Sequence, residues 1–323
     1  MYTESGKPKM ILRESSSAIH MDVFIALIPL LFMAVFSFGP RALLLSAVSV
    51  GAAVAAEMLC KRLMGQKRGF CLTPVITGMI LAMLSPVTMP YWIIAAASFF
   101  SIAAVKMPFG GLGRNPFNPA AAGWCLMALC APAKMFSYPA VQDWMRIPLF
   151  GAGRIEYEAS TAALLREGRV SMASLGDIFF GRPSGPMGTI TVLLLLACCF
   201  YLVFRRAAAW QIPVFFLVGC SAAALMFPRA PGVLWPLASE IFSGSLLFCG
   251  IFMLTDPVTS PKRALSRIAY AFLAGILTIA LRHFGAFEQG APAAVLIVNA
   301  MAPGLDMMFY ALRKGVLSLY GKG

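Results

Sequence analysis

The sequence predicts an all-α integral membrane protein, with about ten transmembrane helices in two inverted five-helix repeats that contain broken helices. Three observations support this fold class. Hydrophobic residues make up 60% of the 323 positions and charged residues 12%, whereas about 25% of a soluble domain is charged. Long apolar runs alternate with short clusters of Lys and Arg, and short motifs of the first half recur in the second. These features exclude an ordinary soluble domain.

Ten apolar segments can be delimited, and some are shorter than the ~20 residues that a straight span needs. Their approximate ranges are 22–38, 42–60, 70–85, 90–106, 119–132, 190–204, 210–227, 235–255, 266–281 and 291–310. The expected organisation is an N-terminal segment 1–21, a first repeat 22–132, a polar loop 133–189, a second repeat 190–310 and a tail 311–323. The first twenty residues are polar, so no cleavable signal peptide is expected.

The basic residues predict the orientation in the membrane. With the N-terminus inside, seventeen of the 26 Lys and Arg lie on the inner side, as the positive-inside rule requires. Both termini are then cytoplasmic, and the loop 133–189 is extracytoplasmic. The short outer loops would hold only Arg41, Arg229 and Arg282. The net charge of +13 is explained by these topology signals, so no nucleic-acid partner is expected.

Three motifs recur in the same order at nearly one offset. The pairs are Pro86-Val87-Thr88 with Pro257-Val258-Thr259, Phe109-Gly110 with Phe284-Gly285, and Pro119-Ala120-Ala121 with Pro292-Ala293-Ala294. Because each half holds five segments, an odd number, the second half is expected to be inverted. Helices broken by Gly or Pro at matching positions mark binding sites in such folds. The alternative is that these prolines only end helices near the interface.

A glycine- and asparagine-rich segment, "FGGLGRNPFNP", follows the fourth apolar run. Glycines allow the backbone to approach a flat ligand closely, and the amides of Asn115 and Asn118 can both donate to and accept from the rim of a heterocycle. No Lys-Ser or Lys-Thr follows the glycines, and the flanks are membrane segments. A Walker A loop and a dinucleotide fingerprint are therefore not expected.

The stretches "FGGLGRNPFNPAAAGW", "GIFMLTDPVTSP", "IHMDVFIALIPLL" and "LRHFGAFEQGAPAAVLIVNAMAPGLD" resemble the RnfD family, whose members are membrane subunits of the Rnf electron-transport complex. That family is related to NqrB, a subunit of the Na+-translocating NADH:quinone reductase. The resemblance implies a flavin-carrying subunit in a bacterial inner (plasma) membrane. It implies partners of the A, B, C, E and G type and a flavin transferase. The complex would couple electron transfer between ferredoxin and NAD to Na+ or H+ transport.

The resemblance also implies two flavin sites. A non-covalent flavin, riboflavin or another, would lie within the membrane near Asn115, Asn118 and the turn from Asp256 to Thr259, with Arg114 and Ser260 as weaker candidates. A second flavin, FMN, would be attached through a phosphoester to a threonine just before the sixth segment.

The attachment segment departs from the family pattern. It reads "SGPMGTIT", and aligning its glycines, Gly185 and Gly188, puts the family threonine at Ile190. Isoleucine has no hydroxyl and cannot form the ester. Thr189 and Thr191 flank this position and become the candidates for covalent FMN. The alternatives are that both are ordinary residues at the start of a span and that covalent FMN is absent.

The remaining ionisable residues give one further candidate. Intramembrane acids are costly and suggest function, and Glu240 has no cation near it in sequence. It is therefore the candidate for an ion pathway, with an interfacial location as the alternative. Glu57 is expected to pair with Lys61 at i+4. The eight cysteines are expected to pack as small apolar residues, and no metal-binding or catalytic residue is predicted.

Two other functions stay open on the residues alone. Composition and the repeat also fit a solute channel or transporter of inverted-repeat design without a redox role. The absence of a hydroxyl at Ile190 fits a structural membrane partner that has lost its flavins. The pairing of the asparagine segment with "TDPVTSP" favours flavin binding over both.

Overall fold

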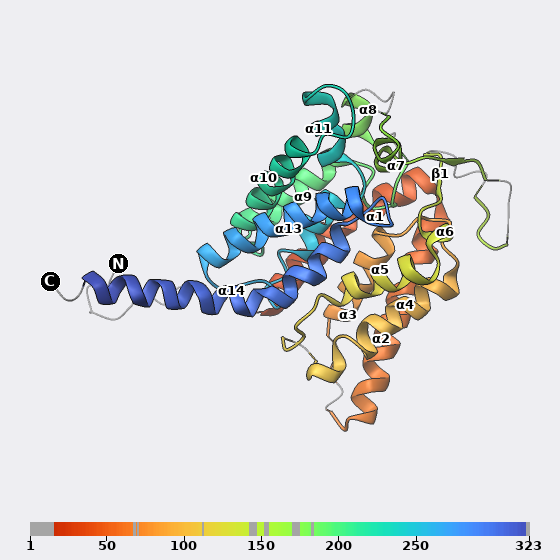
Figure 1. Ribbon diagram of the computed structural model, residues 1–323. Coiled ribbons are helices and arrows are strands. Elements are labelled where there is room, and N and C mark those ends of the chain that lie inside the picture. The colour runs from red at the N-terminus through yellow and green to blue at the C-terminus, as the bar shows by residue number, and fades with distance from the viewer. Residues whose placement is uncertain are drawn as a thin grey trace.

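The computed structural model of the chain describes residues 16–66, 69, 71–111, 113–141, 147–151, 155–169, 175–181 and 184–320. The chain is mainly helical (Figure 1). The helices of the first half are α1 (Ser16–Phe38), α2 (Pro40–Leu63), α3 (Thr73–Met83), α4 (Tyr91–Ala103), η1 (Met107–Phe109) and α5 (Pro119–Cys130). Those of the second half are α9 (Val192–Phe204), α10 (Gln211–Met226), α11 (Leu234–Phe242), α12 (Leu246–Phe248), η3 (Cys249–Met253), α13 (Ala264–Phe284) and α14 (Ala291–Tyr320).

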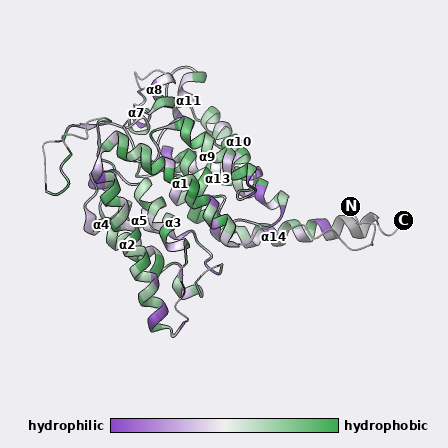
Figure 2. Ribbon diagram, turned by 180° about the vertical axis from the view of Figure 1, so that it is seen from behind, coloured by the Kyte–Doolittle hydropathy of each residue, from purple (hydrophilic) through white to green (hydrophobic). Residues whose placement is uncertain are grey.

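The helices have the length and composition of membrane spans. Among the described residues, five helical segments are long and apolar enough to cross a membrane, and α11 with α12–η3 forms a sixth candidate bent by 57°. Shorter apolar helices, among them α3 and α5, occupy the remaining predicted segments. Figure 2 shows hydrophobic residues along most of the helical length. The chain is a multi-pass membrane protein.

Helix boundaries differ from the sequence prediction at both ends of the chain. The helix α1 begins at Ser16, inside the predicted N-terminal segment. The helix α14 continues to Tyr320, through most of the predicted tail, although Pro303 lies inside it. Residues 1–15 of the N-terminal segment and 321–323 of the tail lie outside the described residues.

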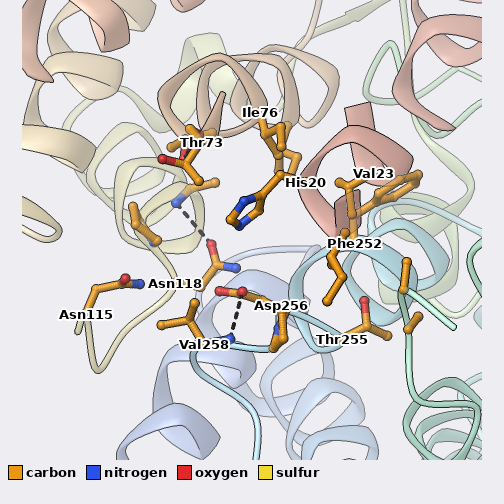
Figure 3. A pocket seen from close by; sticks show the side chains of 18 of the residues that line it. His20, Val23, Thr73, Ile76, Asn115, Asn118, Phe252, Thr255, Asp256 and Val258 are labelled. Atoms are coloured by element: carbon orange, nitrogen blue, oxygen red, sulfur yellow. Dashed lines mark hydrogen bonds between the residues drawn. The ribbon is translucent and has the colours of Figure 1, made fainter. Parts of the chain in front are cut away.

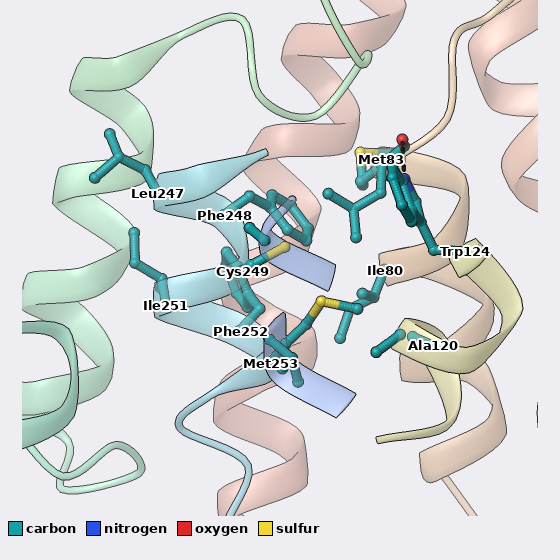
Figure 4. Packing of buried hydrophobic residues seen from close by; sticks show 14 of the residues in the cluster. Ile80, Met83, Ala120, Trp124, Leu247, Phe248, Cys249, Ile251, Phe252 and Met253 are labelled. Atoms are coloured by element: carbon teal, nitrogen blue, oxygen red, sulfur yellow. Dashed lines mark hydrogen bonds between the residues drawn. The ribbon is translucent and has the colours of Figure 1, made fainter. Parts of the chain in front are cut away.

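Two short helical segments form the centre of the molecule: α3, and the continuous segment made of α12 and η3. In α3, nine of the eleven residues are buried, and every residue of α12 and η3 is buried. A helix that is apolar and buried on all sides must be surrounded by other helices. Phe248, Phe252 and Met253 pack toward Ile80 of α3 and Trp124 of α5 (Figure 4). The two halves of the chain therefore share one core.

Long helices pack closely around this centre through small residues. A Cβ added at Gly219 of α10 would lie 2.3 Å from the Phe272 carbonyl oxygen of α13, and one added at Gly275 of α13 would lie 2.4 Å from the Phe216 carbonyl oxygen. In the first half, Ser49 of α2 and Ser98 of α4 share a 2.7 Å hydrogen bond. Small and hydroxylated residues allow such contacts within a membrane, where lipid provides no hydrophobic drive for association.

The described residues of the connection 133–189, together with Pro132, form several short elements. These are α6 (Pro132–Met135), α7 (Thr161–Arg166) and α8 (Leu175–Phe180), and the strands β1 (Tyr138–Pro139) and β2 (Tyr157–Glu158). The two strands pair in antiparallel register. This small sheet departs from the all-α prediction without changing the membrane part. Figure 1 shows α7, α8 and α11 at the same end of the molecule.

The 57° bend lies at Ser243, Gly244 and Ser245, between α11 and α12. Gly244 has φ +61°, which glycine adopts without the steric cost of a Cβ. The bend leaves carbonyl groups without helical partners, and the Arg282 guanidinium donates to the carbonyls of Glu240 at 2.8 Å and Ser243 at 2.9 Å. Arg282 lies within α13 and is fully buried, so its assignment to a short outer loop was wrong.

Candidate functional site

One pocket brings together residues of both halves of the chain. It is lined by α1, by the start of α3, by the segment before α5 and by the turn after η3. Asn115 and Asn118 contribute from the first half and Asp256 from the second. In Figure 3 the side chains of Asn118, Asp256 and His20 point into the same space. Residues 141 positions apart in sequence, Asn115 and Asp256, thus line one cavity.

Asp256 is held by the turn that it starts. Its Oδ1 accepts from the Val258 N–H at 3.1 Å, and its Oδ2 accepts from the Thr259 hydroxyl at 3.3 Å. This is the turn geometry that Asp side chains favour. Burial raises the pKa of the Asp256 carboxyl above its usual range, against the hydrogen bonds from Val258 and Thr259 that lower it. Thr259 contacts Asp256 but is not one of the residues that line the pocket.

Asn118 serves the fold directly. Its Oδ1 accepts from the N–H groups of Ala120 and Ala121 at 3.0 and 3.2 Å, which caps the N-terminus of α5. Its Nδ2 donates to the Met253 carbonyl at 3.4 Å, at the end of η3. Its own backbone N–H donates to Asn299 Oδ1 of α14 at 2.9 Å. Both ends of the Asn118 amide are therefore engaged within the protein.

The other predicted residues of this region differ in placement. Asn115 lines the pocket, and its Nδ2 donates to the Phe117 carbonyl at 3.0 Å. Arg114 and Ser260, the weaker candidates, are not among the lining residues. The structure therefore brings Asn115, Asn118 and Asp256 together and leaves the other two outside.

Three further residues line the pocket that sequence reasoning missed as site residues. His20 lies on α1 and lines the pocket. Lys106 and Thr73 line it as well, and the Lys106 ammonium contacts the Thr73 hydroxyl and the Glu57 carboxylate. These contacts join residues 33 and 49 positions apart, so no local motif could have revealed them. The only signal was the position of a histidine at the start of an apolar run.

The predicted attachment segment, residues 184–191, lies against the turn that follows α3. The N–H of Met187 donates to the Ser85 carbonyl at 3.1 Å, and that of Gly188 donates to the Met83 carbonyl at 2.8 Å. These are carbonyls that the end of α3 leaves free. A Cβ at Gly188 would lie 2.4 Å from Met83 Cβ, so only glycine permits this approach. The "LSPVTMP" turn is thereby covered by the chain itself.

The two candidate threonines have different surroundings. Thr189 and Ile190 line a small pocket with Ser184, Gly185 and the bend at Ser243. The Thr189 hydroxyl is buried and donates to the Pro186 carbonyl at 3.0 Å. Thr191 is not one of the residues that line this pocket, and its buried hydroxyl has no hydrogen-bond partner among the described residues.

Glu240 is not the isolated acid that its sequence neighbourhood suggested. Its Oε1 lies 3.4 Å from Arg282 Nη1 and 3.7 Å from Arg229 Nη2, and its side chain is 6% exposed. Both arginines are distant from Glu240 in sequence, so these contacts could be found only in the structure. A role of Glu240 in an ion pathway stays a prediction. Glu57 does pair with Lys61, at 2.7 Å, as predicted.

The fold and the pocket together define a class: a multi-pass membrane protein in which the turn after a buried, interrupted helix lines a mainly apolar pocket that holds a few polar side chains. The family described as "NQR2, RnfD, RnfE" matches residues 3–314. The chain belongs to this family.

Individual relatives match over almost the whole chain. The D-type subunit of the Na+-translocating ferredoxin:NAD+ oxidoreductase complex of Acetobacterium woodii is 33% identical, with 94% of this chain and 92% of the relative covered. The D-type subunit of the proton-translocating complex of Clostridium ljungdahlii is 28% identical, with 98% and 96% covered. The D-type subunit of the ion-translocating oxidoreductase complex of Stutzerimonas stutzeri is 29% identical, with 92% and 91% covered.

Proposed function

We propose that this chain is a flavin-binding membrane subunit of an ion-translocating complex that couples electron transfer between ferredoxin and NAD to Na+ or H+ transport. The relatives are named as D-type subunits of such complexes. The observation that carries the flavin proposal is the convergence of Asn115 and Asp256 from opposite halves of the chain in one pocket. The partners would be Rnf-type subunits of the A, B, C, E and G type and a flavin transferase.

The polar groups of the pocket that Asn115 and Asp256 line fit the polar edge of a flavin ring. A flavin, when bound, supplies one- and two-electron transfer that no side chain provides. Its ring edge presents both N–H and C=O groups, which match the carboxylate of Asp256 and the amide oxygen and nitrogen of Asn115. His20 and Lys106 add donors to the same pocket, and Ile76, Ile80 and Phe252 supply apolar surface. Asn118 and Thr259 would act by fixing α5 and Asp256.

At the other break, we propose that Thr189 or Thr191 carries covalent FMN. Thr189 is supported by its place in the pocket with Ser184 and Gly185, and Thr191 by a buried hydroxyl that has no protein partner within the described residues. Ile190 excludes attachment at the family position because it has no hydroxyl. The backbone bonds of Met187 and Gly188 to the end of α3 would fix this segment.

The finer topology is part of the same proposal: ten membrane helices in two inverted repeats, in a bacterial inner membrane, with both termini cytoplasmic. Corresponding elements make corresponding contacts, which supports the repeat. The pair α2 and α4 packs like α10 and α13, and α4 and α5 pack like α13 and α14. The counterparts α1 and α9 touch each other, as do α5 and α14, which is the arrangement that a pseudo-twofold axis produces.

Purified protein from a riboflavin-replete host tests the proposed non-covalent flavin site at Asn115 and Asp256. We expect flavin absorbance that is released on denaturation, and a reduced flavin content in Asp256→Ala. The matched control is Glu167→Gln, which removes an exposed carboxylate and should leave the flavin content unchanged. Colourless wild-type protein would contradict the proposal and favour a channel or transporter without a redox role.

Mass spectrometry of the 182–205 peptide tests the proposed covalent FMN site at Thr189 or Thr191. We expect the mass of FMN on this peptide, lost in either Thr189→Val or Thr191→Val and therefore in the double variant. In-gel flavin fluorescence that survives in the double variant would place attachment elsewhere. An unmodified wild-type peptide from a host that contains the transferase would show that covalent FMN is absent.

A further inference from the structure

Arg229 carries a buried guanidinium group with two nitrogens that make no hydrogen bond to the described residues. Its side chain is 8% exposed, and it lies in the turn between α10 and α11. Within the part of the chain that the structure describes, its Nη1 and Nη2 have no hydrogen-bond partner. Buried polar groups are almost always satisfied, and an exception indicates an unseen ligand, ion or water. Guanidinium groups hold phosphates and carboxylates through paired N–H donors.

The charges of the described residues around Arg229 leave an excess of positive charge, which favours the binding of an anion. The one carboxylate that contacts Arg229, among the described residues, is Glu240, and the same Oε1 lies 3.4 Å from Arg282. Arg282 is fully buried and competes with Arg229 for the single carboxylate of Glu240. Arg166 adds a positive charge nearby while it donates to the Gly285 and Ala286 carbonyls. Glu288 is close enough to Arg282 for their charges to interact, and Arg229 forms its ion pair with Glu240.

The pocket around Arg229 lies at the end of a membrane span. It is lined by the last turn of α10, the first turn of α11 and His283 of α13, and α13 is a candidate span that ends at Phe284. Several apolar side chains at this end of the bundle are well exposed: Leu225, Met226, Phe227, Val233, Leu234 and Phe284. A buried cation behind an exposed apolar rim fits an amphiphile, with an anionic head in the pocket and apolar chains outside.

We propose that Arg229 binds the phosphate of an anionic phospholipid headgroup, in the leaflet on the side of α7 and α8. The donors Nη1 and Nη2 point to an oxyanion, and the apolar rim points to its acyl chains. Headgroup phosphates lie at the ends of membrane spans, where α13 ends. Arg229 and Arg282 share the single carboxylate of Glu240, and the lipid phosphate would neutralise the positive charge that remains.

The full chain, purified in detergent and stripped of lipid, tests this proposal. Three probes are compared by thermal melting and by native mass spectrometry: phosphatidylglycerol, diacylglycerol with the same chains, and inorganic phosphate. We expect phosphatidylglycerol to raise the melting temperature and to stay bound, with much smaller effects from the other two. In Arg229→Gln the affinity for phosphatidylglycerol should fall roughly tenfold or more, because charge-assisted hydrogen bonds are lost.

Two further variants keep the test decisive. Arg169→Gln removes a charge from an exposed arginine and should bind like wild type. Arg229→Lys keeps the charge beside Glu240 but loses the paired donors, and should bind with intermediate affinity. Equal binding by wild type and Arg229→Gln overturns the proposal. An increase in melting temperature with inorganic phosphate as large as that with phosphatidylglycerol also overturns it, because the ligand is then a free anion. The proposal is overturned as well if Arg229→Gln binds phosphatidylglycerol like wild type but no longer associates with other subunits, because the ligand is then a protein carboxylate.

Discussion

Arg282 shows how one side chain can support a break in a buried helix. Its donors reach two carbonyls that α11 leaves free at the bend and the carboxylate of Glu240. A free carbonyl in an apolar surrounding costs several kcal/mol, so a bend without such a donor would be unstable. The burial of Arg282 is therefore a consequence of the bend at Ser243 and Gly244.

The Arg282–Glu240 contact predicts a strong effect of Glu240→Gln. The variant removes the carboxylate that forms ion pairs with both Arg229 and Arg282, which we expect to cost about 3–5 kcal/mol of stability. Thermal unfolding of the purified protein measures this loss, with Glu167→Gln as an exposed control. If the melting temperature stays unchanged while ion transport is lost, Glu240 belongs to an ion pathway and the structural explanation is wrong.

Glu288, in the turn before α14, predicts a pH dependence of stability. Burial raises the pKa of its carboxyl, against hydrogen bonds that include one from Ser160 Oγ to Oε1 at 2.9 Å. Because the folded-state pKa is the higher one, the stability that this group contributes is complete below the unfolded value. It is lost as the pH rises from about 4.5 through the folded-state pKa.

The substitution Glu288→Gln keeps an oxygen acceptor for Ser160 and removes the titration. We expect the melting temperatures of wild type and variant to diverge as the pH rises, with the variant the more stable at high pH. Parallel curves across the range would show that Glu288 does not titrate differently on folding.

At the scale of elements, the two helix breaks are satisfied in different ways. Met83 at the end of α3 gives its carbonyl to the N–H of Gly188, and Met253 at the end of η3 gives its carbonyl to the Asn118 amide. The second turn also contains one additional residue, Asp256, when "LSPVTMP" is aligned with "LTDPVTSP". The first turn is closed by the chain, whereas the second borders a pocket.

The close approach of Gly188 to Met83 predicts a selective effect of Gly188→Ala. The added Cβ would lie 2.4 Å from Met83 Cβ, whereas one at Gly185 would lie 3.7 Å from the Thr189 hydroxyl, an ordinary contact. We expect Gly188→Ala to lower the melting temperature and to expose the 184–190 segment to protease. Gly185→Ala should resemble wild type in both measurements. Equal behaviour of the two variants would show that this packing does not constrain the segment.

Sequence reasoning predicted the positions of the helices well because hydropathy is a local property. Each of the ten predicted segments contains a helix. The bend at Ser243–Ser245 was missed although "SGS" interrupts an apolar run. The neighbours of Glu240 and the placement of His20 and Lys106 depend on tertiary contacts. The cluster of Asn115, Asn118 and Asp256 was predicted from motifs, whereas its capping bonds required the structure.

At the scale of the whole molecule, the proposed inversion predicts which loops share a side of the membrane. Engineered cysteines at Gln66 and Phe150, both exposed, would be placed in a variant without the eight native cysteines. An impermeant thiol reagent added to intact cells should label position 150 and not position 66. In inverted vesicles the result should be reversed. Labelling of both positions from one side would contradict the inverted arrangement.

The hydrogen bond from the Asn118 N–H to Asn299 has a consequence for the biogenesis of the protein. It joins residues 181 positions apart, and the Asn299 amide is itself fixed because it donates to the Tyr270 hydroxyl at 2.7 Å. The start of α5 therefore reaches its final position only after α13 and α14 have entered the membrane. A ligand of the pocket beside Asn118 would find its complete site only when synthesis of the chain is nearly finished, so loading of this pocket must follow translation.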